Sequence, residues 1–103
     1  MTKLVFGYSP THPGEVLRDE IEYRKISQRK LAKQMGISYK TLNELLNGRR
    51  PLTTNTAMMF EAALDVPADS LIRLQTKYNL QQAANDKSFM ERLNRIRKYA
   101  AVL

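Results

Sequence analysis

The stretch SQRKLAKQMGISYKTLNELLNG, residues 27–48, decides the fold of this chain. Ser27 and Ser38 stand where a serine hydroxyl can accept a hydrogen bond from a free backbone N–H at a helix start. Gly36 and the pair Asn47-Gly48 stand where a helix can end in a left-handed turn. Between these signals the apolar residues recur at helical spacing, as Leu31, Ala32 and Met35 and then Leu42, Leu45 and Leu46. The pattern predicts two short helices joined by a tight glycine turn.

The second of these helices directs a polar set of side chains away from its leucines. The set comprises Tyr39, Lys40, Thr41, Asn43 and Glu44. Two helices that cross at a short turn, with the small Ala32 where they can approach, outline a helix-turn-helix. Helix pairs also occur in proteins that never bind nucleic acid, so the position of the charged residues is needed as a second indication of DNA binding. From Arg24 to Arg50 the chain has eight basic residues and one acidic residue, which favours a polyanionic partner.

The predicted DNA contacts divide into two sets. The start of the second helix usually enters the major groove, so its polar residues are predicted to meet bases. Lys40 suits guanine acceptors, Asn43 suits adenine, and Glu44 suits the cytosine amino group. Thr41 suits a base edge or a thymine methyl, whereas Tyr39 is either a DNA contact or an aromatic residue packed on the surface. Phosphate contacts are predicted at the edges of the helix pair, for Ser27, Gln28, Arg49 and Arg50.

Composition narrows the class of protein. The 103 residues suit one domain, and 43% hydrophobic residues are enough to bury a core. The net charge of +7 again favours a polyanion. There is no cysteine, one histidine, no HExxH and no glycine-rich phosphate loop, so we expect no catalytic residues, metal or cofactor. No apolar run approaches the roughly 18 residues that span a bilayer, and the start lacks a signal-peptide core. We therefore expect a cytoplasmic protein with no membrane partner and no enzymatic activity.

Helical periodicity also extends over the rest of the chain. A first helix is predicted from about His12-Pro13, with Val16, Leu17 and Ile21 facing the core. Further helices are predicted over 54–64, with Ala57, Phe60 and Leu64 buried, and over 68–78. The predicted organisation is a partly ordered N-terminal arm over 1–11, a DNA-binding domain over 12–79 and a helical extension over 80–103.

The extension carries an apolar seam. Asn85-Asp86 is predicted to cap its helix, after which Phe89, Leu93, Ile96, Ala100 and Leu103 follow one another at steps of four and three. A helix this short is unstable alone, so the seam should pack on the body, on a second copy or on another protein. One helix-turn-helix reads only a few base pairs, and such proteins usually act as dimers on half-sites about 34–36 Å apart. We therefore expect a homodimer.

Three further motifs narrow the family. They are HPGEVL at 12–17, NGRRPLT at 47–53 and LQTKYNL at 74–80. Together with SQRKLAKQMGIS they give a chain that resembles the HigA-type antitoxins, within the broad Xre/Cro-like family of helix-turn-helix proteins. The resemblance implies an all-α, five-helix, lambda-repressor-like domain, here with an additional C-terminal helix. The tail beyond residue 80 is longer than in compact members of the family.

The resemblance also implies two activities. Such antitoxins neutralise a cognate toxin, typically a RelE- or HigB-like enzyme that cuts mRNA, and they bind the operator of their own operon and repress it. By matching motif positions, the DNA-facing residues would be Gln28, Tyr39, Lys40, Thr41, Asn43 and Glu44. Two alternatives stay open: a stand-alone Xre-family transcriptional repressor without a toxin, and a protein-binding adaptor whose helix pair does not bind DNA.

Overall fold

The computed structural model describes residues 11–103, which form six α-helices. In chain order they are α1 (Pro13–Tyr23), α2 (Gln28–Met35), α3 (Tyr39–Leu46), α4 (Thr54–Leu64), α5 (Ala68–Ala84) and α6 (Lys87–Ala100). The predicted fold class, five helices with an additional C-terminal helix, is confirmed over this part of the chain. The predicted arm at 1–11 lies, except for its last residue, outside the described residues.

The helices begin and end at the signals that the sequence provides. Five N-caps accept a hydrogen bond from the helix they precede, and these are His12, Ser27, Ser38, Thr53 and Asp86. Pro13 occupies the first position of α1, where its missing N–H has no intrahelical partner to lose. Gly36 ends α2 at φ 73° and Gly48 follows α3 at φ 70°, so both take the left-handed conformation that glycine adopts without strain.

One core joins the first five helices. It includes Leu17 and Ile21 of α1, the two apolar runs of α2 and α3, and the row Ala57, Phe60 and Leu64 of α4. The prediction for Val16 is wrong, because this side chain is 39% exposed. The buried face of α1 runs through Pro13, Gly14, Leu17 and Ile21, and Val16 lies beside that stripe instead of on it.

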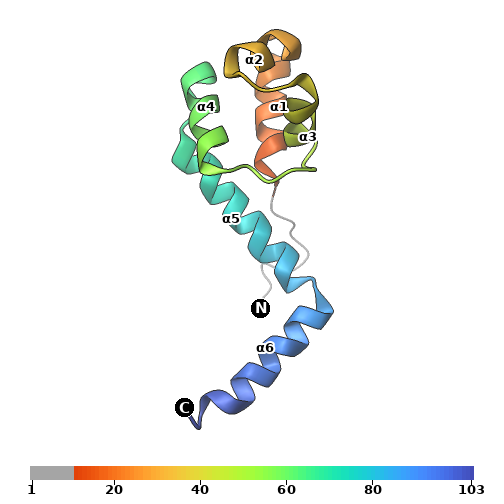
Figure 1. Cartoon of the computed structure of the whole chain (residues 1–103), viewed down its shortest axis with the longest axis vertical. Coiled ribbons are helices and arrows are strands. Elements are labelled where there is room, and N and C mark those ends of the chain that lie inside the picture. The colour runs from red at the N-terminus through yellow and green to blue at the C-terminus, as the bar shows by residue number, and fades with distance from the viewer. Residues whose placement is uncertain (1–10) are drawn as a thin grey trace.

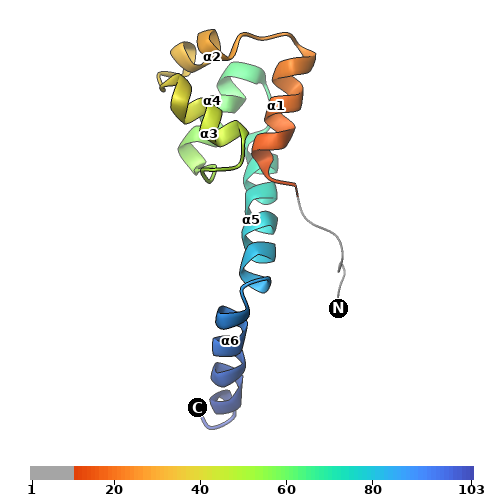
Figure 2. The ribbon, with the colours of Figure 1, turned by 90° about the vertical axis from the view of Figure 1, so that its right-hand side faces the viewer.

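The helices form a packed end and a projecting tail (Figure 1). Helices α1–α4 gather around the start of α5, and the rest of α5 leads away from them to α6, which both views place at the far end (Figures 1 and 2). The extents of 55 × 27 × 22 Å reflect this elongated shape. Helix α5 continues to Ala84, beyond the predicted end at residue 78, so the predicted division at residues 79 and 80 falls inside a continuous helix.

Helix α6 does not pack on the body. It has no buried residue, and α5 is the helix it contacts. Of the predicted seam, Phe89 is 38% exposed and Ile96 is 56% exposed. The seam was expected to pack on the body, on a second copy or on another protein. The structure does not show it packed on the body of the same chain.

Candidate nucleic-acid interface

Helix α3 is held rigidly by its apolar face. Leu42, Leu45 and Leu46 are at most 1% exposed, and α3 packs on both α1 and α2. The start of α1 approaches α3 so closely that a Cβ atom on Gly14 would lie 2.0 Å from the carbonyl oxygen of Leu45. Because only glycine permits this approach, the packing fixes both the position and the tilt of α3.

The predicted base-contacting residues lie on the outer side of α3. Tyr39 and Lys40 are exposed, whereas Thr41, Asn43 and Glu44 are half-buried. Thr41 belongs to the cap of its own helix, because its Oγ1 accepts a hydrogen bond from the Ser38 hydroxyl at 2.9 Å. The hydroxyl of Ser38 in turn accepts from the backbone N–H of Thr41 at 3.0 Å. The first turn of α3 is therefore held by hydrogen bonds between its own residues and its N-cap.

Glu44 and Arg50, predicted for different contact sets, form an ion pair. The Nη2 of Arg50 donates to Oε1 of Glu44 at 2.7 Å, and its Nε donates to the same oxygen at 3.2 Å. The hydrogen bond from Arg50 holds the pKa of Glu44 below its ordinary value, partial burial opposes this, and the charges of Arg50, Lys40 and Arg49 reinforce it. Glu44 is therefore ionised at neutral pH, and Arg50 is oriented by it.

The remaining predicted phosphate contacts lie at the edges of the helix pair. Ser27 caps α2 by accepting from the backbone N–H of Lys30, and Gln28 is the half-buried first residue of that helix. Arg49 follows α3 and is exposed. The fold thus brings the start of α2, the outer side of α3 and the loop after α3 into one region of basic and polar side chains.

Arg29 is one of the eight basic residues between Arg24 and Arg50, and the sequence predicted no specific role for it. The guanidinium carbon of Arg29, in α2, lies 4.3 Å from the centre of the Tyr39 ring. The two residues are ten positions apart on different helices, so helical periodicity contains no signal for this contact. Only the crossing of α2 and α3 places them together.

Two polar residues outside the predicted contact sets, His12 and Gln75, are buried. The His12 Nδ1 accepts from the backbone N–H of Gly14 at 2.9 Å, and its ring meets that of Tyr78 edge to face at 4.9 Å. Gln75 Oε1 accepts from the backbone N–H of Leu52 at 2.8 Å. These contacts fasten α5 to the start of α1 and to the loop that follows α3.

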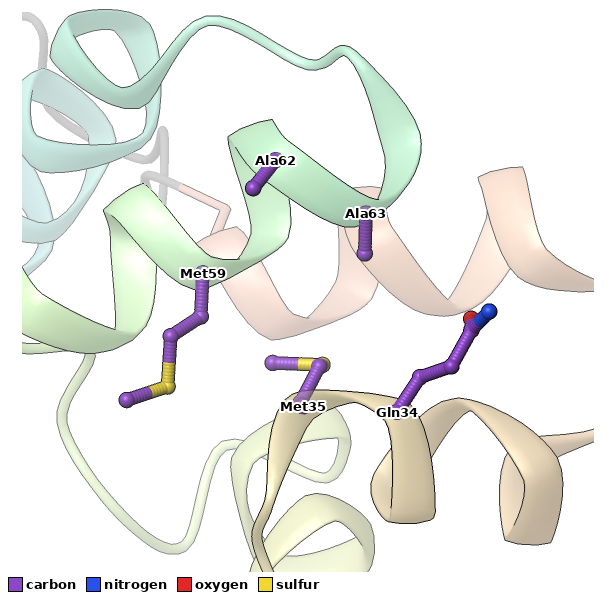
Figure 3. A pocket seen from close by; sticks show the side chains of 5 residues that line it. All are labelled: Gln34, Met35, Met59, Ala62 and Ala63. Atoms are coloured by element: carbon purple, nitrogen blue, oxygen red, sulfur yellow. The ribbon is translucent and has the colours of Figure 1, made fainter.

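No comparable constellation for catalysis is found among residues 11–103. A pocket between α2 and α4 has a volume of about 370 Å³ and is lined by Gln34, Met35, Met59, Ala62 and Ala63, none of which titrates (Figure 3). No group of three or more histidine, cysteine, aspartate or glutamate residues suits a metal ion within the described part of the chain. None of the six helices is both long and apolar enough to cross a bilayer.

A rigid outer helix that crosses a capped partner at a glycine turn, with basic residues on both flanks, defines a helix-turn-helix domain. The chain belongs to the helix-turn-helix family, whose sequence profile matches residues 17–71, and its domain is of the Xre-like type. Virulence-associated protein I of Dichelobacter nodosus is 35% identical over 77 residues, which cover 74% of this chain and 71% of that protein.

Solved structures with the same fold include HigA-family antitoxins. The HigA-family addiction module antidote protein of Coxiella burnetii superposes with a TM-score of 0.71 at 29% identity, covering 79% of this chain and 89% of that one. The antitoxin HigA of Pseudomonas aeruginosa, solved with the higBA promoter, gives a TM-score of 0.68 at 34% identity, covering 77% and 89%. This chain is therefore similar, in sequence and in structure, to HigA-type antitoxins, as the motifs of the sequence indicate.

Proposed function

We propose that this protein is an antitoxin that binds the operator of its own operon as a homodimer and neutralises a HigB-like, mRNA-cleaving toxin. The observation that carries the DNA-binding part is α3, whose first turn is capped and polar while its leucines are buried against α1 and α2. The similarity to a HigA antitoxin solved with promoter DNA supports both parts. The net charge of +7 favours the same polyanionic ligand.

The proposed contacts follow from where each side chain lies. Lys40, Asn43 and Thr41 read base edges in the major groove, and Ser27, Gln28 and Arg49 contact backbone phosphates. Glu44 contributes through Oε2, because both hydrogen bonds from Arg50 end on Oε1 and leave the second oxygen to accept from a cytosine amino group. Tyr39 and Arg50 complete the proposed surface at its two ends.

The DNA-binding part is tested by fluorescence anisotropy. A labelled duplex from the region upstream of the gene is compared with a scrambled duplex of equal length at a stated salt concentration. A sequence-specific repressor should bind the first at least about 10³-fold more tightly. Equal affinity for the two duplexes would contradict an operator-binding role, and absence of binding to either would leave the adaptor alternative.

The toxin-binding part requires a second experiment. The product of the adjacent reading frame is expressed alone and together with this protein, and growth and co-purification are measured. Growth arrest by the neighbour alone, relieved when the two proteins co-purify, is the expected result. A harmless neighbour, or one that does not co-purify, would leave the stand-alone repressor as the better description, provided that operator binding is observed.

The homodimer is proposed to form through the C-terminal extension. The seam of α6 has exposed apolar side chains at Phe89 and Ile96, and such a helix gains stability only when it is covered. Light scattering on the purified protein should give twice the mass of the 11.9 kDa chain. Ile96→Ser should shift the mass toward the monomer, whereas Arg95→Ser, next to it on the polar side, should not. Equal behaviour of the two variants would place the dimer contact elsewhere.

A further inference from the structure

Arg29 and Tyr39 connect the starts of the two helices of the motif. Arg29 is the second residue of α2 and Tyr39 is the first residue of α3. The guanidinium carbon lies over the ring, 4.3 Å from its centre. Arg29 is exposed and Tyr39 is 38% exposed, so the pair lies on the surface of the molecule. The contact between these two exposed side chains can orient the guanidinium of Arg29, and it is not part of the hydrophobic core.

The charge of Arg29 is not neutralised by this contact. The three ion pairs among residues 11–103 engage Arg24, Arg50 and Arg73. An aromatic ring attracts a cation through its quadrupole and leaves the full charge in place. It also uses none of the five N–H donors, which lie in the plane of the guanidinium. Arg29 therefore keeps its full capacity to bind an anion.

Arg50 provides the contrast within the same region. It was predicted as a phosphate contact, but Nε and Nη2 both donate to Glu44, whose charge opposes its own. Arg29 has an aromatic partner where Arg50 has a carboxylate. Of these two arginines, Arg29 is therefore better prepared to bind phosphate.

We propose that Arg29 binds a backbone phosphate of the DNA and that the ring of Tyr39 positions it for this contact. The inference rests on the proposed function. In a docked helix-turn-helix the first helix crosses the sugar–phosphate backbone while the second enters the groove. A guanidinium at the start of α2, held against the start of α3, lies at the boundary between these two regions. The planar fork of arginine matches phosphate oxygens, and the ring reduces the freedom that the side chain loses on binding.

The assignment changes the expected role of Tyr39. The ring is the functional part, and the hydroxyl is dispensable. Tyr39 is then a positioning residue for a phosphate contact, and it does not read a base. Four variants of the full chain separate these roles: Arg29→Ala, Tyr39→Phe, Tyr39→Leu, and the double variant of Arg29→Ala with Tyr39→Leu.

Affinity for the upstream duplex and for the scrambled duplex is measured for each variant between about 50 and 200 mM salt. Arg29→Ala should weaken binding to both duplexes by the same factor and lower the slope of log K against log salt by about one unit. Tyr39→Phe should bind both duplexes as tightly as the wild type, and Tyr39→Leu should weaken binding to both duplexes. The double variant should be no weaker than Arg29→Ala, because the ring acts through Arg29. Lys77→Ala, which removes an equal charge from exposed α5, is the matched control and should change the slope less.

Three results would overturn the inference. The first is an unchanged slope in Arg29→Ala while wild-type protein binds the upstream duplex, which would leave the proposed function intact. The second is a loss confined to the upstream duplex, which would make Arg29 a base contact. The third is a loss in Tyr39→Phe as large as in Tyr39→Leu, which would give the hydroxyl a direct role. Wild-type protein that binds neither duplex would overturn the proposed operator binding and this inference together.

Discussion

The backbone N–H of Leu52 donates a hydrogen bond of 2.8 Å to Oε1 of Gln75, which lies 23 positions further along the chain. Gln75 is only 5% exposed, and its Nε2 donates to Asn79 Oδ1. The bond satisfies a buried donor in the loop that follows α3 and fastens this loop to α5. Since the His12 ring also packs on Tyr78, the motifs HPGEVL, NGRRPLT and LQTKYNL meet one another in space.

Replacing Gln75 should destabilise the fold. Gln75→Leu keeps the volume roughly constant but leaves the Leu52 N–H buried without an acceptor, which costs about 1–3 kcal/mol. The free energy of unfolding is measured by urea denaturation. Asn79→Ala removes only the outer, exposed partner of Gln75 and should cost less. A Gln75→Leu variant as stable as the wild type would show that the Leu52 N–H is satisfied in another way.

Gly14→Ala should also destabilise, for a different reason. The added Cβ would meet the carbonyl oxygen of Leu45 at 2.0 Å, so α1 must move away from α3. Overpacking of this kind costs about 1–3 kcal/mol, which exceeds the roughly 1 kcal/mol that alanine gains over glycine within a helix. The control is Gly36→Asn, which should destabilise the fold less than Gly14→Ala. A Cβ atom at position 36 would meet no neighbouring atom, and asparagine tolerates positive φ. A thermal melt in which Gly14→Ala is the more stable variant would contradict the close approach of the two helices.

Local sequence signals predicted the helices of this fold, and tertiary contacts decided the rest. Ser27, Ser38 and Gly36 act within one helical turn, so their roles could be read from neighbouring residues. The same reasoning placed Val16 in the core, because periodicity gives the width of a buried stripe only approximately.

The supporting contacts of the candidate site could not be predicted in this way. Arg29 with Tyr39, Glu44 with Arg50, and Leu52 with Gln75 depend on how helices cross and on where loops return. The sequence identified the polar face of α3 because its residues share one helix. It did not indicate that Glu44 and Arg50 would form an ion pair. This pair links a predicted base contact, Glu44, to a predicted phosphate contact, Arg50.

Stability should depend on pH through His12. Burial lowers the pKa of His12, and Glu15 opposes this only in part. The unfolded chain, with an ordinary histidine pKa of about 6.5, therefore binds a proton more readily than the folded chain. The stabilising contribution is complete above about pH 6.5 and is lost as pH falls through the lower folded pKa. Protonation would also remove the Nδ1 lone pair that accepts from Gly14.

The matched variant for this effect is His12→Asn. Asparagine is a good N-cap and supplies an acceptor that does not titrate. Unfolding free energies are measured from about pH 7.5 to 5.5, where the wild type should lose stability faster than His12→Asn. Parallel profiles for the two proteins would mean that His12 does not carry the pH dependence.

Arg49 and Arg50 should contribute differently to DNA binding although they are neighbours in sequence. Arg49→Ala should weaken binding on all sequences and lower the salt slope by about one unit. Arg50→Ala should lower the slope less, because the charge of Arg50 is already opposed by Glu44. Anisotropy titrations over a salt series measure both slopes. A larger change for Arg50→Ala would show that the ion pair opens when DNA binds.

Lys40→Ala should affect specificity more than general affinity. Lys40 is exposed on the first turn of α3, where it can reach guanine acceptors in the major groove. Its removal should cost about 1–3 kcal/mol on the operator and relax the preference at one base position. Affinity is measured on a set of duplexes that differ from the operator at single positions, in parallel with the scrambled duplex.

Leu45→Ala on the buried side of the same helix separates recognition from folding. It opens a cavity in the core and should cost about 2–5 kcal/mol of stability, so any loss of binding should follow loss of folded protein. Lys40→Ala should instead melt at the wild-type temperature, because the Lys40 side chain is exposed and outside the core. If Lys40→Ala weakens binding to the operator and to the scrambled duplex by equal factors, Lys40 contacts phosphate. The base contacts of α3 must then be made by Asn43, Thr41 and Glu44.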